Sequence, residues 1–277
     1  MSGWQAHLTL DYTRTAERTV AKFEHAGPLR VLQSLYPEGD AVCHNVLVHP
    51  PSGLVGGDLL DIQLNLGVGT HALLTTPGAT RFYRSEQGLA TQQVNAYVGE
   101  GARLEWLPLE TIAYNGCHGL NHAVFDLAPT AEMMAWDITA LGLPNANLPF
   151  ERGQLQQHME VRGVWLERGL VDAQDTRLMD GPLGLAKYRC MATLMFACGA
   201  DLPRERRELA LSLARELTEA SPAGLVAGVT SPHPRMVVLR TLSPLVEPAQ
   251  NLLRGVWAAW RRGLWAMSDR PPRIWSM

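Results

Sequence analysis

Alternating apolar and polar residues fill most of the first 200 positions. Residues 6–13 set Leu8, Leu10 and Tyr12 against His7 and Asp11, which is the two-residue period of a half-buried strand. Similar segments recur at 19–23, 29–32, 41–49, 59–66, 71–76, 91–98, 102–106, 124–127, 132–141, 156–161, 164–172 and 185–195. Turn residues separate them about every ten positions, and no repeat of fixed length stands out. The pattern predicts a mostly β body over residues 1–199, with sheets stacked as a sandwich or a β-helix-like layering.

Helical periodicity begins after residue 200. Leu202, Leu209, Leu213 and Leu217 recur three to four residues apart with Asp201 as a candidate N-cap, which predicts a helix. Short strands are expected at 225–229 and 236–239. A second apolar stripe starts near residue 248 and is expected to end at the proline pair 271–272. Residues 200–277 are therefore expected to form a small part-helical subdomain with a C-terminal tail.

Composition narrows the function classes. The chain has 277 residues, 46% of them hydrophobic, and a net charge of −3, so nothing in its charge points to nucleic acid. No apolar run is long enough to span a membrane, and four scattered cysteines without a signal segment favour a reducing cytoplasm.

The C-terminal end is basic and aromatic. Trp and Arg are the side chains enriched at interface hot spots. The candidate partner-binding residues are Trp257, Trp260, Arg261, Arg262, Arg273 and Trp275. A solvated helix face explains the arginines equally well, core packing explains Trp257 and Trp260, and Trp275 could anchor the tail to the β body.

Three acids stand among apolar or glycine-rich neighbours, where a carboxylate needs donors or a cation. They are Asp58, Glu110 and Asp137. In one interpretation they pair with Arg81 or Arg84 or cap turns through backbone N–H groups. In the other they line an internal polar path for a hydrated divalent ion. No histidine or cysteine spacing matches a structural zinc site, so no tightly bound cofactor is expected.

The loop from His49 to Asp58 reads HPPSGLVGGD, and its prolines and glycines force an irregular turn. It matches neither a phosphate loop nor a nucleophile elbow. A β-sandwich hydrolase that uses His49, Ser52 and Asp58 remains an alternative function.

Four motifs in order resemble a known family. They are PPSGLVGGD at 50–58, TTPGATRFYRS at 75–85, GARLEWLPLETIAYNG at 101–116 and the terminal RPPRIW, with Gln92 between the second and third. Together they are similar to the urease accessory protein D family, called H in some organisms. One departure lies at 142–152, where the family's G-R-x-x-x-G-E segment is replaced.

The resemblance implies a function. Members of that family are non-enzymatic scaffolds with a large β structure and a small helical part. They bind the urease apoprotein, recruit accessory protein F and through it the G GTPase, and assist GTP-dependent nickel insertion. For this chain the resemblance implies transient nickel(II) contact and an F-protein contact at the second helix and tail.

Overall fold

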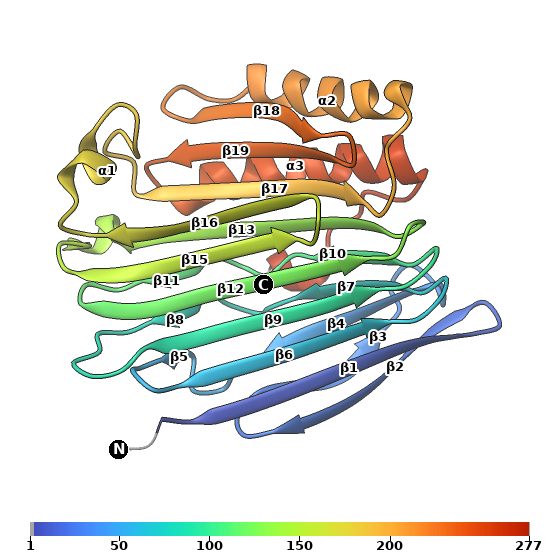
Figure 1. The fold of residues 1–277 in the computed structure, drawn as a ribbon, viewed down its shortest axis with the longest axis horizontal. Coiled ribbons are helices and arrows are strands. Elements are labelled where there is room, and N and C mark those ends of the chain that lie inside the picture. The colour runs from blue at the N-terminus through green and yellow to red at the C-terminus, as the bar shows by residue number, and fades with distance from the viewer. Residues whose placement is uncertain (1–2, 277) are drawn as a thin grey trace.

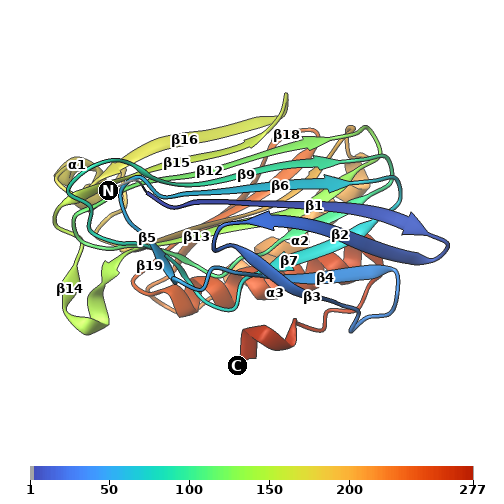
Figure 2. The same ribbon diagram turned by 90° about the horizontal axis from the view of Figure 1, so that it is seen from below.

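The protein is built in three layers, which the computed structural model describes over residues 3–276. A seven-stranded sheet, here the front sheet, lies against a twelve-stranded sheet, here the middle sheet, and the two long helices cover the far side of the middle sheet (Figures 1 and 2). The front sheet has the order β16 (Trp165–Asp172), β15 (Gly153–Val161), β12 (Cys117–Leu127), β9 (Ala90–Val98), β6 (Leu59–Leu66), β1 (Gln5–Thr15) and β2 (Arg18–Ala26). The mostly β prediction is confirmed.

The middle sheet combines parallel and antiparallel strands. Its main order is β18 (Val226–His233), β19 (Met236–Ser243), β17 (Cys190–Cys198), β13 (Glu132–Leu143), β10 (Arg103–Trp106), β7 (His71–Thr75), β4 (Val42–Val48) and β3 (Arg30–Leu35). Four short strands join beside it, namely β5 (Gly53–Leu54), β8 (Thr80–Phe82), β11 (Thr111–Ala113) and β14 (Leu148–Pro149).

The centre of the molecule is a solenoid. From β4 to β15 the longer strands alternate between the sheets, and each pairs in parallel with the next strand of its own sheet. In the middle sheet Val42, His71, Arg103 and Glu132 stand side by side. One coil thus recurs roughly every 30 residues, which is a solenoid period. The coils differ in loop length, so the sequence has no repeat of fixed length, as expected. The structure nevertheless repeats one coil, which the sequence analysis did not predict.

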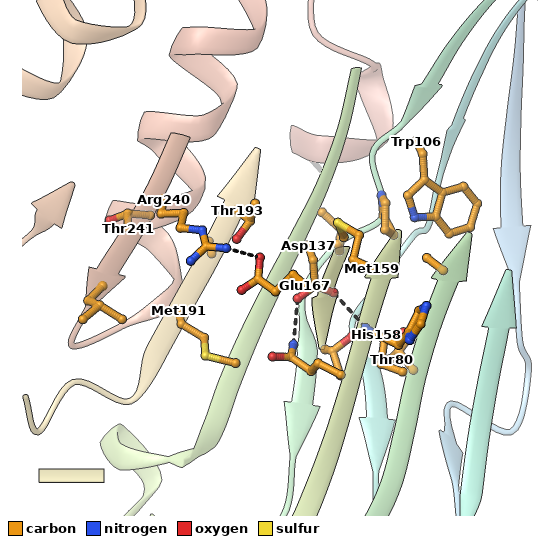
Figure 3. A pocket seen from close by; sticks show the side chains of 18 of the residues that line it. Thr80, Trp106, Asp137, His158, Met159, Glu167, Met191, Thr193, Arg240 and Thr241 are labelled. Atoms are coloured by element: carbon orange, nitrogen blue, oxygen red, sulfur yellow. Dashed lines mark hydrogen bonds and ion pairs between the residues drawn. The ribbon is translucent and has the colours of Figure 1, made fainter. Parts of the chain in front are cut away.

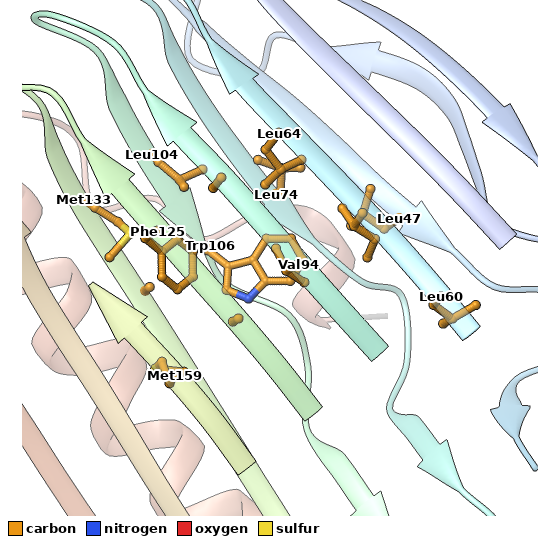
Figure 4. Close-up of a cluster of buried hydrophobic side chains, with 14 of the residues drawn as sticks. Leu47, Leu60, Leu64, Leu74, Val94, Leu104, Trp106, Phe125, Met133 and Met159 are labelled. Atoms are coloured by element: carbon orange, nitrogen blue, oxygen red, sulfur yellow. The ribbon is translucent and has the colours of Figure 1, made fainter. Parts of the chain in front are cut away.

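The strand alternation predicted from the sequence creates the first core. Leu60, Ile62 and Leu64 of β6 point between the sheets and are buried, whereas Asp61 and Gln63 face outward. Leu47, Leu74, Val94, Leu104 and Phe125 meet them in the same space (Figure 4).

A second core lies between the middle sheet and the helices. It gathers the opposite faces of the same strands, including Met134, Trp136 and Phe196, against α2 (Arg204–Glu219) and α3 (Val246–Trp265). Residues 200–277 also supply β18 and β19, which extend the middle sheet through β17. The C-terminal segment is therefore continuous with that sheet.

Several element ends differ from the sequence-based expectations. Helix α2 begins after Pro203, because Asp201 instead forms an ion pair with Arg235. Helix α3 ends at Ala266 in the left-handed conformation, before the proline pair. Strand β17 starts only at residue 190, because the short helix α1 (Thr176–Asp180), capped by Asp175, and its following turns precede it.

Two short 3-10 turns complete the element list, η1 (Pro144–Ala146) and η2 (Arg273–Ser276). Within residues 3–276, no helix is both long enough and apolar enough to cross a membrane.

Candidate functional site

The glycine loop is held together by Asp58. Its carboxylate accepts the backbone N–H of Trp4 at 2.8 Å and of Val55 at 2.9 Å, which ties the N-terminal segment to the loop. Gly53 permits a close approach, because a Cβ at this position would lie 2.1 Å from the Tyr83 ring. Asp58 is buried, and its carboxylate contacts backbone N–H groups, as in the first of the two interpretations of this acid.

The groups of the alternative hydrolase are not assembled. Among the described residues no hydrogen bond joins the side chains of His49, Ser52 and Asp58. Burial lowers the pKa of His49, and the nearby charge of Asp58 only partly opposes it. A nucleophile needs a base within hydrogen-bonding distance, and this loop does not provide that pair.

A cavity of about 480 Å³ opens between the two sheets (Figure 3). The front sheet contributes Gln92, Asn121, Gln157 and Glu167 to its wall, and the middle sheet contributes Asp137, Thr193 and Arg240. Apolar side chains such as Trp106, Met159 and Met191 complete the lining. The polar groups come from seven different strands, so only the folded chain brings them together.

Asp137 is the centre of the polar network. Its carboxylate accepts hydrogen bonds from Asn121 Nδ2 at 2.8 Å, from Gln157 Nε2 at 3.0 Å and from Thr139 Oγ1 at 2.9 Å. The network continues from Asn121 to Gln92 at 3.2 Å and on to Thr80 at 3.3 Å. The cavity wall therefore carries a continuous chain of hydrogen bonds.

The environment makes Asp137 titratable near neutral pH. Burial raises its pKa to about 6, even though the donors from Thr139, Asn121 and Gln157 favour the charged form. The exposed part of its side chain faces the cavity. Buried carboxyl groups whose pKa is shifted this far are typical of functional sites.

An ion pair stands at the edge of this cavity. Arg240 donates to Glu167 Oε2 at 2.7 Å, and both side chains are partly solvent-exposed. Burial raises the pKa of Glu167, and the Arg240 charge partly offsets this rise. Glu167 and Arg240 therefore lie between the interior network and the solvent.

A second cavity of about 220 Å³ lies towards the glycine loop. It is lined by His49, Ser52 and the Thr76–Arg81 turn region, and it shares Thr80, Gln92, Trp106 and Pro108 with the first cavity. The shared wall connects the glycine loop with the Asp137 network.

The three predicted acids are separated in the structure. Only Asp137 lines a cavity, whereas Asp58 binds backbone N–H groups and Glu110 is half-buried near the charges of Arg81 and Arg254. Over residues 3–276, no group of three or more His, Cys, Asp or Glu side chains is arranged to hold a metal ion. Sequence reasoning missed Glu167 and the amides, although Asn121 and Gln157 stand at inward-facing positions of their strands.

Most of the predicted partner-binding residues are buried. Trp257, Trp260, Arg261 and Trp275 pack inside the chain, while Arg262 and Arg273 are exposed. Arg262 pairs with Asp269. A partner can therefore reach only the two exposed arginines of this set directly.

Arg261 is the centre of a buried ionic cluster. Its guanidinium binds Glu38 at 2.9 and 3.0 Å and lies 3.3 Å from Glu105. His44 bonds to Glu38 at 2.8 Å, and His71 bonds to Glu105 at 2.7 Å. The cluster thereby joins helix α3 to strands β4, β7 and β10.

The two carboxyl groups of this cluster stay ionised. Burial would raise the pKa of Glu105, but His71, Arg261 and the Trp257 indole N–H outweigh it and hold the pKa below its usual value. Burial also opposes the charged form of Glu38, and His44 and Arg261 again lower its pKa.

Trp275 docks the tail on the outer side of the middle sheet. Its ring lies 5.1 Å from Trp136 and 5.2 Å from Trp257, and its indole N–H donates to Thr75 Oγ1 at 2.8 Å. The Arg254 guanidinium lies over the same ring at 4.8 Å. Through these contacts Trp275 anchors the tail to the β body.

Comparisons with known proteins cover nearly the whole chain. A model of the UreD urease accessory protein family matches residues 5–276. Relatives named urease accessory protein UreD include one from Polaromonas sp. strain JS666, 58% identical over 274 residues, and one from Variovorax paradoxus strain S110, 59% identical over 273 residues. Each alignment covers 99% of this chain and 99% of the relative.

A further relative, from Leptothrix cholodnii, is 52% identical over 274 residues and carries the same name. The matches are thus to accessory proteins of urease over their whole length. The chain belongs to the UreD urease accessory protein family, and the resemblance inferred from its four motifs is confirmed.

Proposed function

We propose that this chain acts in urease maturation as a scaffold without turnover of its own. It binds the urease apoprotein and the F and G accessory proteins and assists GTP-dependent nickel insertion. The observation that carries the proposal is the match to relatives named as urease accessory proteins along 98 to 99% of the chain. The unassembled side chains of the His49–Asp58 loop support a role other than hydrolysis.

Nickel(II) is the cargo of this proposal and travels through the space between the sheets. A hydrated divalent ion needs oxygen donors that bind weakly enough to release it. The amides of Gln92, Asn121 and Gln157 and the carboxyl group of Asp137 supply such oxygens along one wall. Asp137 is neutral below about pH 6 and charged above it, so it attracts a cation mainly at neutral pH.

Among the three predicted acids, Asp137 holds the role in the path. Asp58 and Glu110 act on it indirectly, since Asp58 fixes the glycine loop beside the second cavity and the Glu110 carbonyl accepts the Thr80 N–H.

The contact with the F protein is placed at the C-terminal end of α3 and the tail. Arg262 and Arg273 are the exposed groups of the predicted set, and the buried Trp257, Trp260, Arg261 and Trp275 hold this surface in shape. A chain truncated after Ser268 would lose η2 and the Trp275 anchor. Its co-purification with the F protein should fall strongly, and full retention would exclude the tail from the contact.

The experiment for the maturation role is co-expression. Urease subunits and the F and G accessory proteins are produced with and without this chain, and urease activity and nickel content are measured. We expect both to depend on the chain. Full activation in its absence would refute the proposal.

A further inference from the structure

No segment within residues 3–276 covers the outer face of the front sheet. Figure 1 looks directly onto this face, and none of the described segments crosses it; both long helices lie on the other side of the molecule (Figure 2). Strands β1, β6, β9, β12 and β15 are parallel neighbours here. Parallel sheets are normally covered on both faces, so a bare one is unusual in a globular chain.

The outward-facing side chains of this face stand in rows. Because the strands are in register, one row contains His7, Asp61, Gln93, His122, His158 and Arg168. The neighbouring row contains Thr9, Gln63, Asn95, Val124, Glu160 and Leu166. Such rows make a flat surface that is rich in hydrogen-bonding groups.

The face is acidic. Strands β6, β9, β12 and β15 contain no lysine or arginine at all, but they carry Asp61, Asp126 and Glu160. Neighbouring amides orient some of the acids, since Gln63 donates to Asp61 at 2.6 Å. A surface of this charge repels phosphate groups and attracts lysine and arginine side chains.

The size of the face suits a protein partner. Five strands about 4.8 Å apart span ~24 Å, and eight residues at ~3.3 Å each span ~26 Å, so the face covers on the order of 600 Å². A standard interface buries about 800 Å² on each partner. Tyr97, which is 51% exposed, and the exposed Leu166 and Leu170 supply apolar contact points within or beside the acidic area.

We infer that the outer face of the front sheet is a docking surface for a flat, lysine- and arginine-rich surface of the urease apoprotein. This inference rests on the proposed function, because that function supplies the partner. It differs from the F-protein contact, which lies on the opposite, helical side. The chain would then be held between two partners, with its inter-sheet cavity between the two contacts.

Carboxyl footprinting tests the inference on the wild-type protein. The chain alone and its purified complex with urease apoprotein are labelled with a carbodiimide and a small amine, and modified positions are mapped by mass spectrometry. We expect labelling of Asp61, Asp126 and Glu160 to fall several-fold in the complex. The exposed acids Glu205 and Glu208 of α2 serve as internal controls that keep their labelling.

Charge reversal provides the second arm. The double variant Asp126→Lys/Glu160→Lys should bind urease apoprotein at least about tenfold more weakly, and its binding should depend less on salt concentration. The matched control Glu205→Lys/Glu208→Lys changes the total charge equally and should bind as the wild type does.

The possible results distinguish a failure of the docking inference from a failure of the proposed function. Unchanged labelling of the front-sheet acids in an intact complex overturns the inference and leaves the maturation role standing. Protection that appears only after the F and G proteins are added overturns urease as the occupant. If the wild-type chain forms no complex with urease apoprotein, the proposed function itself fails.

Discussion

Replacing Arg261 should destabilise the protein far more than replacing its neighbour Arg262. Arg261 is fully buried and is the one guanidinium that contacts both Glu38 and Glu105 among the described ion pairs. In Arg261→Met the apolar stem is kept, but both carboxylates lose the guanidinium and keep only the hydrogen bonds to their histidines, His44 and His71. Arg262→Met removes only an exposed pair with Asp269, so the two variants differ in burial and not in chemistry.

The expected loss of folding free energy depends on how deeply each ion pair is buried. Removing one partner of a buried ion pair costs about 3–5 kcal/mol, because an uncompensated charge remains in the interior. An exposed pair contributes about 0–1 kcal/mol. For a chain of this size 1 kcal/mol corresponds to roughly 2–4 °C in Tm, so Arg261→Met should lower Tm by about 6–20 °C.

Thermal unfolding followed by tryptophan fluorescence measures this difference at neutral pH and low salt. Adding Glu105→Gln to Arg261→Met removes one of the two carboxylates that have lost the guanidinium and should recover at least about 1 kcal/mol, since the effects of residues in one network are not additive. A Tm of Arg261→Met within about 2 °C of that of Arg262→Met would refute the reasoning.

The remaining predictions concern acid, the tail and the glycine loop. Because the pKa of Glu105 is lowered in the fold, its stabilisation is present above its unfolded pKa and is lost as the pH falls through the folded value; thermal melts between about pH 5 and 3 should show a smaller loss in Glu105→Gln. Trp275→Ala should cost about 3–5 kcal/mol in denaturant titrations. Gly53→Ala should cost about 1–3 kcal/mol by displacing Tyr83, while Gly78→Ala, with nothing within 4 Å, should be neutral in the same titrations.

The pattern of the strands could be predicted because each alternates between a buried and an exposed face. Residues 59–66 illustrate this, since the predicted alternation matches β6 with Asp61 outside and Ile62 inside. The two long helices could also be predicted, because leucine or tryptophan recurs every three to four residues along each of them. The period of apolar residues can be recognised in the sequence because it follows from the local geometry of a strand or helix.

The pairing of strands and the composition of the site could not be predicted. The parallel partners of β12 are residues about 30 positions away, and no local pattern encodes that register. Asp137 could be predicted as a site residue because it is an acid among apolar neighbours in a strand. Glu167 and Arg240 come from antiparallel strands far apart in the sequence, and only the fold places them 2.7 Å apart.

The buried ends of α3 and the tail illustrate the same limit. Trp and Arg together predict an interface, but Trp257 and Arg261 satisfy that chemistry within the chain through Glu105. The sequence could not tell an internal aromatic and ionic interface from an external one, because both use the same side chains.

Nickel bound per urease molecule tests the central claim most directly. Urease is matured in cells with the F and G proteins and either the wild-type chain, Asp137→Asn in the cavity, or the exposed control Asp201→Asn, and its nickel is measured after purification. With equal amounts of folded chain bound to urease, the proposal predicts that Asp137→Asn lowers nickel content several-fold and that Asp201→Asn leaves it unchanged. Equal nickel with all three chains would contradict passage of the ion through the inter-sheet cavity.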